Sequence, residues 1–145
     1  MQAWGQTTTK HNDGYISVLK VYSSATLATT ATAAVVEEYT PTGASQTAPN
    51  FIDSLPTTGT NRITISGSST TAGGITRAEN GRYLVAAGYD NAVGDATTTM
   101  ATSAFRTILG SGTIGTGIKG TFFTAGAANN RCGVTDDGKI GRAHV

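Results

Sequence analysis

Short runs of alternating apolar and polar residues recur along the chain, and turn-forming residues separate most of them. In residues 15–22, Ile16 and Val18 share one face of the expected strand. Leu19 and Val21 share the opposite face. Further strands are expected at 33–39, 51–55, 61–66, 74–77, 82–87, 100–109, 121–124, 131–135 and 139–140. Since few segments show a helical period, the pattern predicts an all-β protein of antiparallel sheets.

Asx-Gly pairs stand before three of these runs, at Asp13-Gly14, Asn80-Gly81 and Asp137-Gly138. Such pairs predict tight hairpin turns, because both central residues of a type I′ turn need a positive φ angle. They recur at intervals of about 60 residues, the length of a four-stranded blade with its loops. The recurrence favours β-propeller-like blades, and a β-sandwich is the alternative fold. One segment, 26–38, keeps a helical alternative because alanine-rich runs favour helices.

The chain has 145 residues, enough for one domain but too few for a closed propeller of about 4–8 blades. We expect a polar N-terminal arm at 1–12, a propeller-like domain at 13–140 and a tail at 141–145. The domain would hold about two to three incomplete blades. Copies of the chain would then complete the ring or pair their open strand edges. A fragment without function of its own is the remaining interpretation.

Composition argues against several classes of protein. Only 13% of the residues are charged, the net charge is +1, and basic residues stand singly along the chain. No basic stripe is therefore present to bind nucleic acid. No apolar run approaches the roughly 18–20 residues of a transmembrane helix. Residues 1–6 lack the features of a secretion signal, and the single Cys132 cannot form an internal disulfide.

Two stretches carry a resemblance to a known group of proteins. The first, residues 33–39, ends in EEY, and the second covers residues 61–67, 74–77 and 80–90 and ends in AGYD. They resemble large secreted bacterial β-propeller proteins, several of which end in a PEP-CTERM sorting tail. In that group a strand ending DEYT is followed by LSGTATSEGxLTRSxDGRYLxLAGYD. The likeness spans about residues 13–138 and is distinctive only in its RYL…AGYD segment.

The resemblance implies a propeller-like fold and export from the cell, and it implies no particular activity. Members of the group are roughly two to three times longer, so this chain is similar to the N-terminal third of one. Their signal peptide and later blades have no counterpart here. Residues 141–145 depart from the group's pattern, and we leave open whether they belong to the natural protein.

The two histidines, His11 and His144, suggest one candidate metal site together with Asp13. Two histidines and a carboxylate can hold a divalent metal with an open coordination position. They lie near opposite ends of the chain, which ring closure would bring together. Such a site supports an alternative function, a small hydrolase formed at the oligomer interface. Exposed histidines without a ligand are the simpler interpretation, and no organic cofactor is predicted.

Trp4 and Tyr89 are the aromatic residues that we expect to be exposed, so they are candidates for stacking on a sugar. Asp90, beside Tyr89, would bond to sugar hydroxyls. Oxygen ligands for Ca²⁺ are also present at Asp90, Asn91 and Asp95, and at Asp136 and Asp137, although turns require such residues for backbone reasons. We therefore expect an extracellular binding or structural module that self-assembles. Its ligand, a carbohydrate or other small molecule, would bind in a central channel or at rim loops.

Overall fold

The computed structural model describes residues 14–22, 27–41, 48–70, 72–78, 83–96, 103–109, 119–120, 134–135 and 140–141. All regular structure in these residues is β-strand, which confirms the all-β prediction. The strands are β1 (Ile16–Val21), β2 (Ala31–Thr32), β3 (Ala34–Tyr39), β4 (Phe51–Ser54), β5 (Ile65–Ser66), β6 (Gly74–Arg77), β7 (Tyr83–Tyr89), β8 (Ser103–Leu109), β9 (Lys119–Gly120), β10 (Val134–Thr135) and β11 (Ile140–Gly141). Within the same residues, no helix is long and apolar enough to cross a membrane.

Four antiparallel sheets contain these strands. The first sheet has the order β1-β3-β4 and the second has the order β6-β7-β8-β9. Two smaller sheets pair β2 with β5 and β10 with β11. The helical alternative for residues 26–38 is wrong wherever that segment is described, because β2 and β3 occupy it. There Val35 and Val36 are stiff, β-branched residues that suit a pleated surface between two neighbouring strands.

Two hairpins are centred where the Asx-Gly pairs predict them. Strands β6 and β7 pair Arg77 with Leu84, a register centred on the sequence positions of Asn80 and Gly81. Strands β10 and β11 pair Val134 with Gly141, a register centred on positions 137 and 138. The turn residues themselves lie outside the described part of the chain, as does the strand expected at 121–124. The local turn signal therefore predicted the register of both hairpins.

The main core lies between the first and second sheets. Leu19 and Val21 of β1 and Val36 of β3 face inward, and Ala86 of β7 meets them from the second sheet. Ile63, in the connection after β4, is fully buried in the same cluster. Inward apolar residues alternate with outward ones along β1, which is the arrangement expected of a sheet with one buried face.

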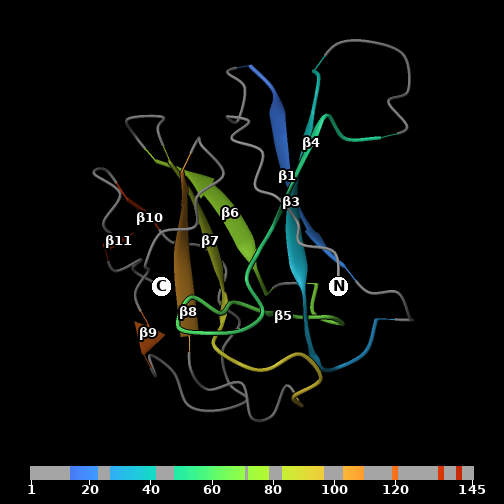
Figure 1. Cartoon of the computed structure of the whole chain (residues 1–145), viewed down its shortest axis with the longest axis vertical. Coiled ribbons are helices and arrows are strands. Elements are labelled where there is room, and N and C mark those ends of the chain that lie inside the picture. The colour runs from blue at the N-terminus through green and yellow to red at the C-terminus, as the bar shows by residue number, and fades with distance from the viewer. Residues whose placement is uncertain are drawn as a thin grey trace.

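The second sheet is covered on both of its faces. Ala86 faces the first sheet, whereas its neighbours Val85 and Ala87 point to the opposite side because successive strand residues alternate. Both are nevertheless fully buried. The β10–β11 hairpin lies against β6, β7 and β8, on the side of the second sheet away from β1, β3 and β4 (Figure 1). Three layers follow one another in chain order: first sheet, second sheet and hairpin.

One end of the two-sheet core is closed by the segment 63–67. Thr64 and Tyr89 each donate a backbone hydrogen bond to the other, with N···O distances of 2.9 and 2.8 Å. On the other side of this segment, β5 pairs with β2. The strand expected at 61–66 is thus shorter than predicted, and its segment lies between β2 and the end of β7.

Candidate functional site

Several of the residues that the sequence nominated lie outside the described part of the chain. They are Trp4, the three members of the candidate metal site, His11, Asp13 and His144, and the aspartates Asp136 and Asp137. Their roles therefore stay predictions. Of the nominated residues, Tyr89, Asp90, Asn91 and Asp95 are described, and all four lie at the end of β7 or in the loop that follows it. Among the described residues, no group of three or more His, Cys, Asp or Glu is placed to hold a metal ion.

The exposure expected of Tyr89 is wrong. Its relative exposure is 4%, and it forms a small buried cluster with Ala31, against which Ala72 also packs. Two backbone hydrogen bonds between Tyr89 and Thr64 hold the end of β7 against the segment that leads to β5. A buried ring cannot stack on a sugar, so Tyr89 does not provide the expected binding platform.

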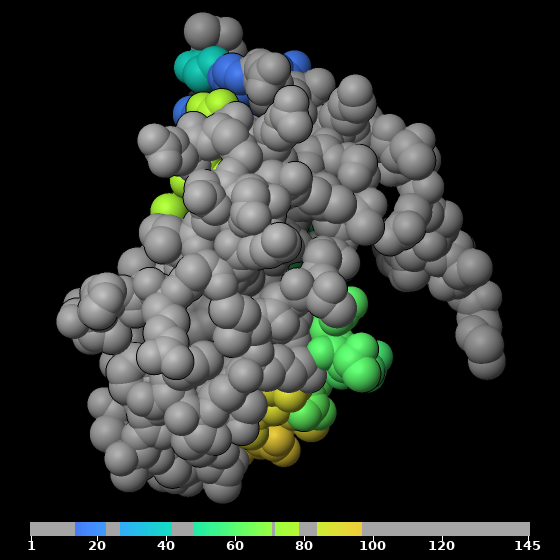
Figure 2. Space-filling model, turned by 90° about the vertical axis from the view of Figure 1, so that its left-hand side faces the viewer, coloured from blue at the N-terminus to red at the C-terminus, as the bar shows by residue number. Residues whose placement is uncertain are grey.

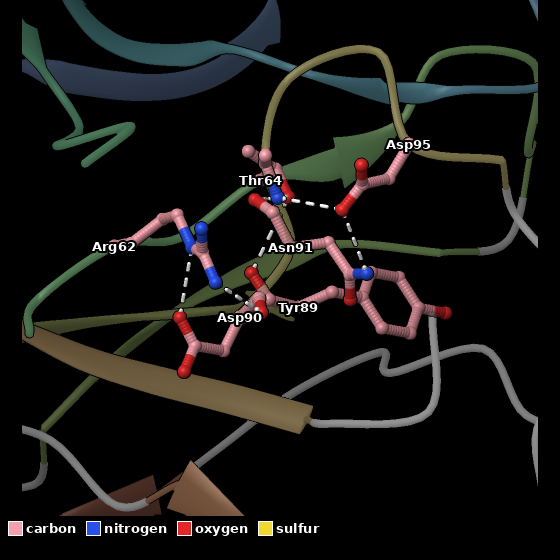
Figure 3. A network of polar contacts seen from close by, with 7 residues as sticks. Arg62, Thr64, Tyr89, Asp90, Asn91 and Asp95 are labelled. Atoms are coloured by element: carbon pink, nitrogen blue, oxygen red, sulfur yellow. Dashed lines mark hydrogen bonds and ion pairs between the residues drawn. The ribbon is translucent and has the colours of Figure 1, made fainter. Parts of the chain in front are cut away.

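Asp90 forms an ion pair with Arg62 instead of facing solvent alone. Arg62 Nε donates to Asp90 Oδ1 at 2.9 Å, and Arg62 Nη2 donates to the Asp90 carbonyl oxygen, also at 2.9 Å (Figure 3). Both side chains are partly buried. The segments 56–62 and 90–96, green and gold in Figure 2, adjoin each other at the surface. The guanidinium therefore fastens the connection after β4 to the loop after β7.

The loop that follows β7 is held by its own polar side chains. Asp95 Oδ2 accepts a hydrogen bond from Ala92 N at 2.9 Å and another from Asn91 Nδ2 at 3.2 Å. The Thr64 hydroxyl lies within hydrogen-bonding distance of the Asn91 carbonyl oxygen, 3.1 Å away (Figure 3). Backbone bonds from Gly94 N to the Ala31 oxygen and from Ala31 N to the Asp95 oxygen fix the loop against β2. We call residues 62, 64 and 89–95 the polar clasp.

The polar clasp is better suited to holding two layers together than to binding a cation. Its two carboxylates, Asp90 and Asp95, already accept hydrogen bonds from the protein. One buried oxygen, Asn91 Oδ1, has no hydrogen bond within the described structure. The clasp contains no histidine, cysteine or lysine that could act as nucleophile or base. The turn role of Asp90, Asn91 and Asp95 thus accounts for their positions.

The first sheet presents a different kind of surface on the side away from the core. We define the outer face by nine residues that share this side: Ile16, Val18, Lys20, Tyr22, Val35, Glu37, Tyr39, Ile52 and Ser54. Ile16 and Ile52 are 51% and 52% exposed, and Val18 is 41% exposed. Exposed aliphatic side chains therefore lie together on one face of this sheet, on both sides of β3.

A polar group lies in the middle of the outer face. Lys20 Nζ donates to Glu37 Oε1 at 2.9 Å, and the Tyr39 hydroxyl donates to Glu37 Oε2 at 2.7 Å. The Glu37 side chain is only 7% exposed, and its two oxygens accept hydrogen bonds from Lys20 on the neighbouring strand β1 and from Tyr39 on its own strand, β3. Opposite Glu37 on β1 stands Val18, and opposite it on β4 stands Ile52.

The hydrogen bonds among Lys20, Glu37 and Tyr39 favour the charged forms of Glu37 and Lys20. The Tyr39 hydroxyl, and then Lys20, hold the pKa of Glu37 below its ordinary value, although burial opposes them. The bond to Glu37 raises the pKa of Lys20 and that of Tyr39. Glu37 is therefore ionised and Lys20 is protonated at neutral pH. A carboxylate with a lowered pKa is a poor general base near neutral pH.

Sequence reasoning found part of the outer face and missed the rest. The alternation in residues 15–22 already separates Ile16 and Val18 from the inward side chains. The meeting of Lys20 with Glu37 depends on the register between β1 and β3, for which the sequence carries no turn signal. Comparison with protein-family models, curated proteins and solved structures finds no match to this chain.

Proposed function

We propose that this chain is a structural or binding module of stacked antiparallel sheets that assembles with itself through the outer face. The observation that carries the proposal is the contrast between the two main sheets. Val85 and Ala87 of the second sheet are fully buried beneath a further layer, whereas Ile16 and Ile52 of the first sheet remain half exposed. A sheet face of this kind gains stability when another sheet covers it.

Covering the outer face would contribute part of the free energy of association. Complete burial of a valine or isoleucine side chain contributes about 1.5–3 kcal/mol, and Ile16, Val18 and Ile52 have about half of this contribution still to gain. Their summed contribution of about 3 kcal/mol would be added to backbone and polar contacts made by the same surface. This contribution offsets part of the cost of association, which is about 4–15 kcal/mol, and the other contacts of the surface would supply the rest.

The layer order favours propeller-like blades as the form of this stack. A sandwich consists of two sheets, whereas here a hairpin lies on the far side of the second sheet. Successive layers formed by successive stretches of chain are the arrangement of a radial repeat. The resemblance to secreted bacterial propellers supports the same fold and an extracellular location. A carbohydrate or other small-molecule ligand would then bind at the axis or at the rim loops of the assembly.

The solution mass of the purified chain tests this function, measured by light scattering over a range of concentrations. We expect a discrete oligomer for the wild type and a monomer for Ile52→Lys, because a lysine at the centre of the covered face would be buried without a partner. Val93→Lys is the matched control, since Val93 is 55% exposed but lies in the loop after β7. A monomeric wild type, or an Ile52→Lys variant of unchanged mass, would overturn the proposal.

A further inference from the structure

The outer face carries an exposed cation that a partner has to accommodate. The Lys20 side chain is 50% exposed, and its ammonium makes one described hydrogen bond, to Glu37. An ammonium has three donors, and covering it without further acceptors carries a desolvation cost. A partner that covers the outer face should therefore bring a carboxylate to Lys20.

The outer face of a second copy is a poor source of that carboxylate. Its acidic residue is Glu37, whose two oxygens already accept hydrogen bonds from Lys20 and Tyr39. Two outer faces related by a two-fold axis would bury two Lys20 ammonium groups and bring no further carboxylate. A symmetric contact is thus disfavoured by charge, although its aliphatic side chains would pack.

The sequence of the β10–β11 hairpin, at the opposite end of the stack, contains acidic residues that complement Lys20. The β10–β11 hairpin is the last layer, and the four residues that connect its strands are Asp136, Asp137, Gly138 and Lys139. Two successive aspartates against the single Lys139 leave this connection with a net negative charge, and they supply the carboxylates that the outer face lacks. The same hairpin already lies against a sheet within one chain, where it covers the side of β7 away from the first sheet.

We propose that the hairpin end of one copy binds the outer face of the next, so that the chains assemble head to tail, with Asp136 or Asp137 meeting Lys20. This inference rests on the proposed self-assembly and names the partner surface. It makes the contact heterologous, which produces a closed ring when the rotation between copies closes and a filament when it does not. In either case, each internal first sheet would be covered on both faces, as the second sheet already is.

A mixing experiment with charge-reversed full-length chains tests the head-to-tail contact. One variant is Lys20→Glu, and the other is the double variant Asp136→Lys, Asp137→Lys. Each alone should assemble about tenfold more weakly than the wild type, because its contact would juxtapose like charges. An equimolar mixture should recover the wild-type mass in light scattering, because each variant supplies the charge that the other lacks. Circular dichroism of each variant checks that its sheets are intact, and Ser54→Thr on the outer face is the control.

The outcomes separate this inference from the proposed function. Recovery on mixing supports head-to-tail binding. If the double variant assembles as well as the wild type while Lys20→Glu does not, the outer face binds something other than the hairpin and the inference is wrong. If both variants stay impaired and mixing recovers nothing, the inference also fails. A wild type that is monomeric at every concentration would remove the proposed self-assembly itself.

Discussion

Arg62 and Asp90 lie 28 positions apart in the sequence, and one guanidinium binds both the carboxylate and the backbone carbonyl of the same aspartate. The contact joins the connection between β4 and β5 to the loop that follows β7. These two segments belong to different layers of the molecule. The Arg62–Asp90 contact therefore holds the two main sheets together at one end of their shared core.

Removing the guanidinium should loosen this end of the molecule. We expect Arg62→Ala to lower the free energy of unfolding by about 1–2 kcal/mol, since it removes two charge-assisted hydrogen bonds from a partly buried aspartate. Urea unfolding followed by circular dichroism measures the change. Arg77→Ala, at an exposed position on β6, is the control and should cost less than about 0.5 kcal/mol. Equal midpoints for the two variants would show that the ion pair contributes nothing.

Core packing between the sheets can be tested with a matched pair of valines. Val36 is fully buried between the two sheets, whereas Val93 is mostly exposed. We expect Val36→Ala to cost about 1.5–3 kcal/mol, through lost burial and the cavity that remains. Val93→Ala should change the stability by less than about 0.5 kcal/mol. Thermal and urea unfolding measure both changes, and a similar cost for the two variants would contradict the assigned core.

Gly88 allows a close approach of two backbone segments. A Cβ atom at this position would lie 2.5 Å from the Thr64 carbonyl oxygen and 2.8 Å from Ile63 Cγ1. The Thr64 oxygen cannot move away easily, because it accepts the backbone hydrogen bond of Tyr89. We therefore expect Gly88→Ala to destabilise the fold by at least about 2 kcal/mol.

Gly59→Ala is the control for Gly88→Ala. Gly59 has a φ of +74°, and no atom lies within 4 Å of the place that an added Cβ would take, so its alanine variant meets backbone strain without a steric clash. That variant should cost about 1 kcal/mol, measured in the same urea titration. If Gly88→Ala proved as mild as Gly59→Ala, the close contact between β7 and Thr64 would be refuted.

From the hydrogen bonds of Glu37 we expect the protein to lose stability in acid. Because the folded-state pKa of Glu37 is lowered, first by the Tyr39 hydroxyl, the ionised carboxylate stabilises the folded state above its unfolded pKa of about 4.3. This stabilisation disappears as the pH falls through the lower, folded-state pKa. Tyr39→Phe should raise the pKa of Glu37 toward its ordinary value and reduce the acid-side loss.

Urea midpoints between pH 7 and pH 2.5 measure this effect. The difference between wild type and Tyr39→Phe should be largest at neutral pH and should shrink in acid, where Glu37 is protonated in both proteins. Glu37→Gln removes the titrating group and is the control. Parallel midpoint curves for wild type and Tyr39→Phe would contradict the assigned hydrogen bond.

Local sequence signals predicted the hairpins and the first strand. The pairing of Arg77 with Leu84 follows from the Asn80-Gly81 signal between the two strands. The two faces of β1 follow from the alternation around Val18 and Leu19. These features depend on residues that are close together along the chain, so the sequence contains them directly.

The candidate sites depended on pairings that have no local signal. Tyr89 is buried because its backbone pairs with Thr64, in a segment 25 positions earlier. From the sequence we expected Tyr89 to be exposed, and tertiary contacts overrode that expectation. Likewise, Lys20 and Glu37 meet only because β1 and β3 pair in one particular register. The burial of Tyr89 and the contact between Lys20 and Glu37 can be recognised only when the sheet order is known.

The reciprocal bonds between Thr64 and Tyr89 also determine how the molecule opens. The segment that contains Thr64 is hydrogen-bonded on one side to β7 and, through Gly67 and β5, on the other side to Thr30 and β2. Neither neighbour can detach without exposing a fully buried part of the chain. The amide protons of Thr64 and Tyr89 should consequently exchange with deuterium only when the whole two-sheet core opens. Strands β2, β5 and β7 are thereby joined into a single cooperative unit.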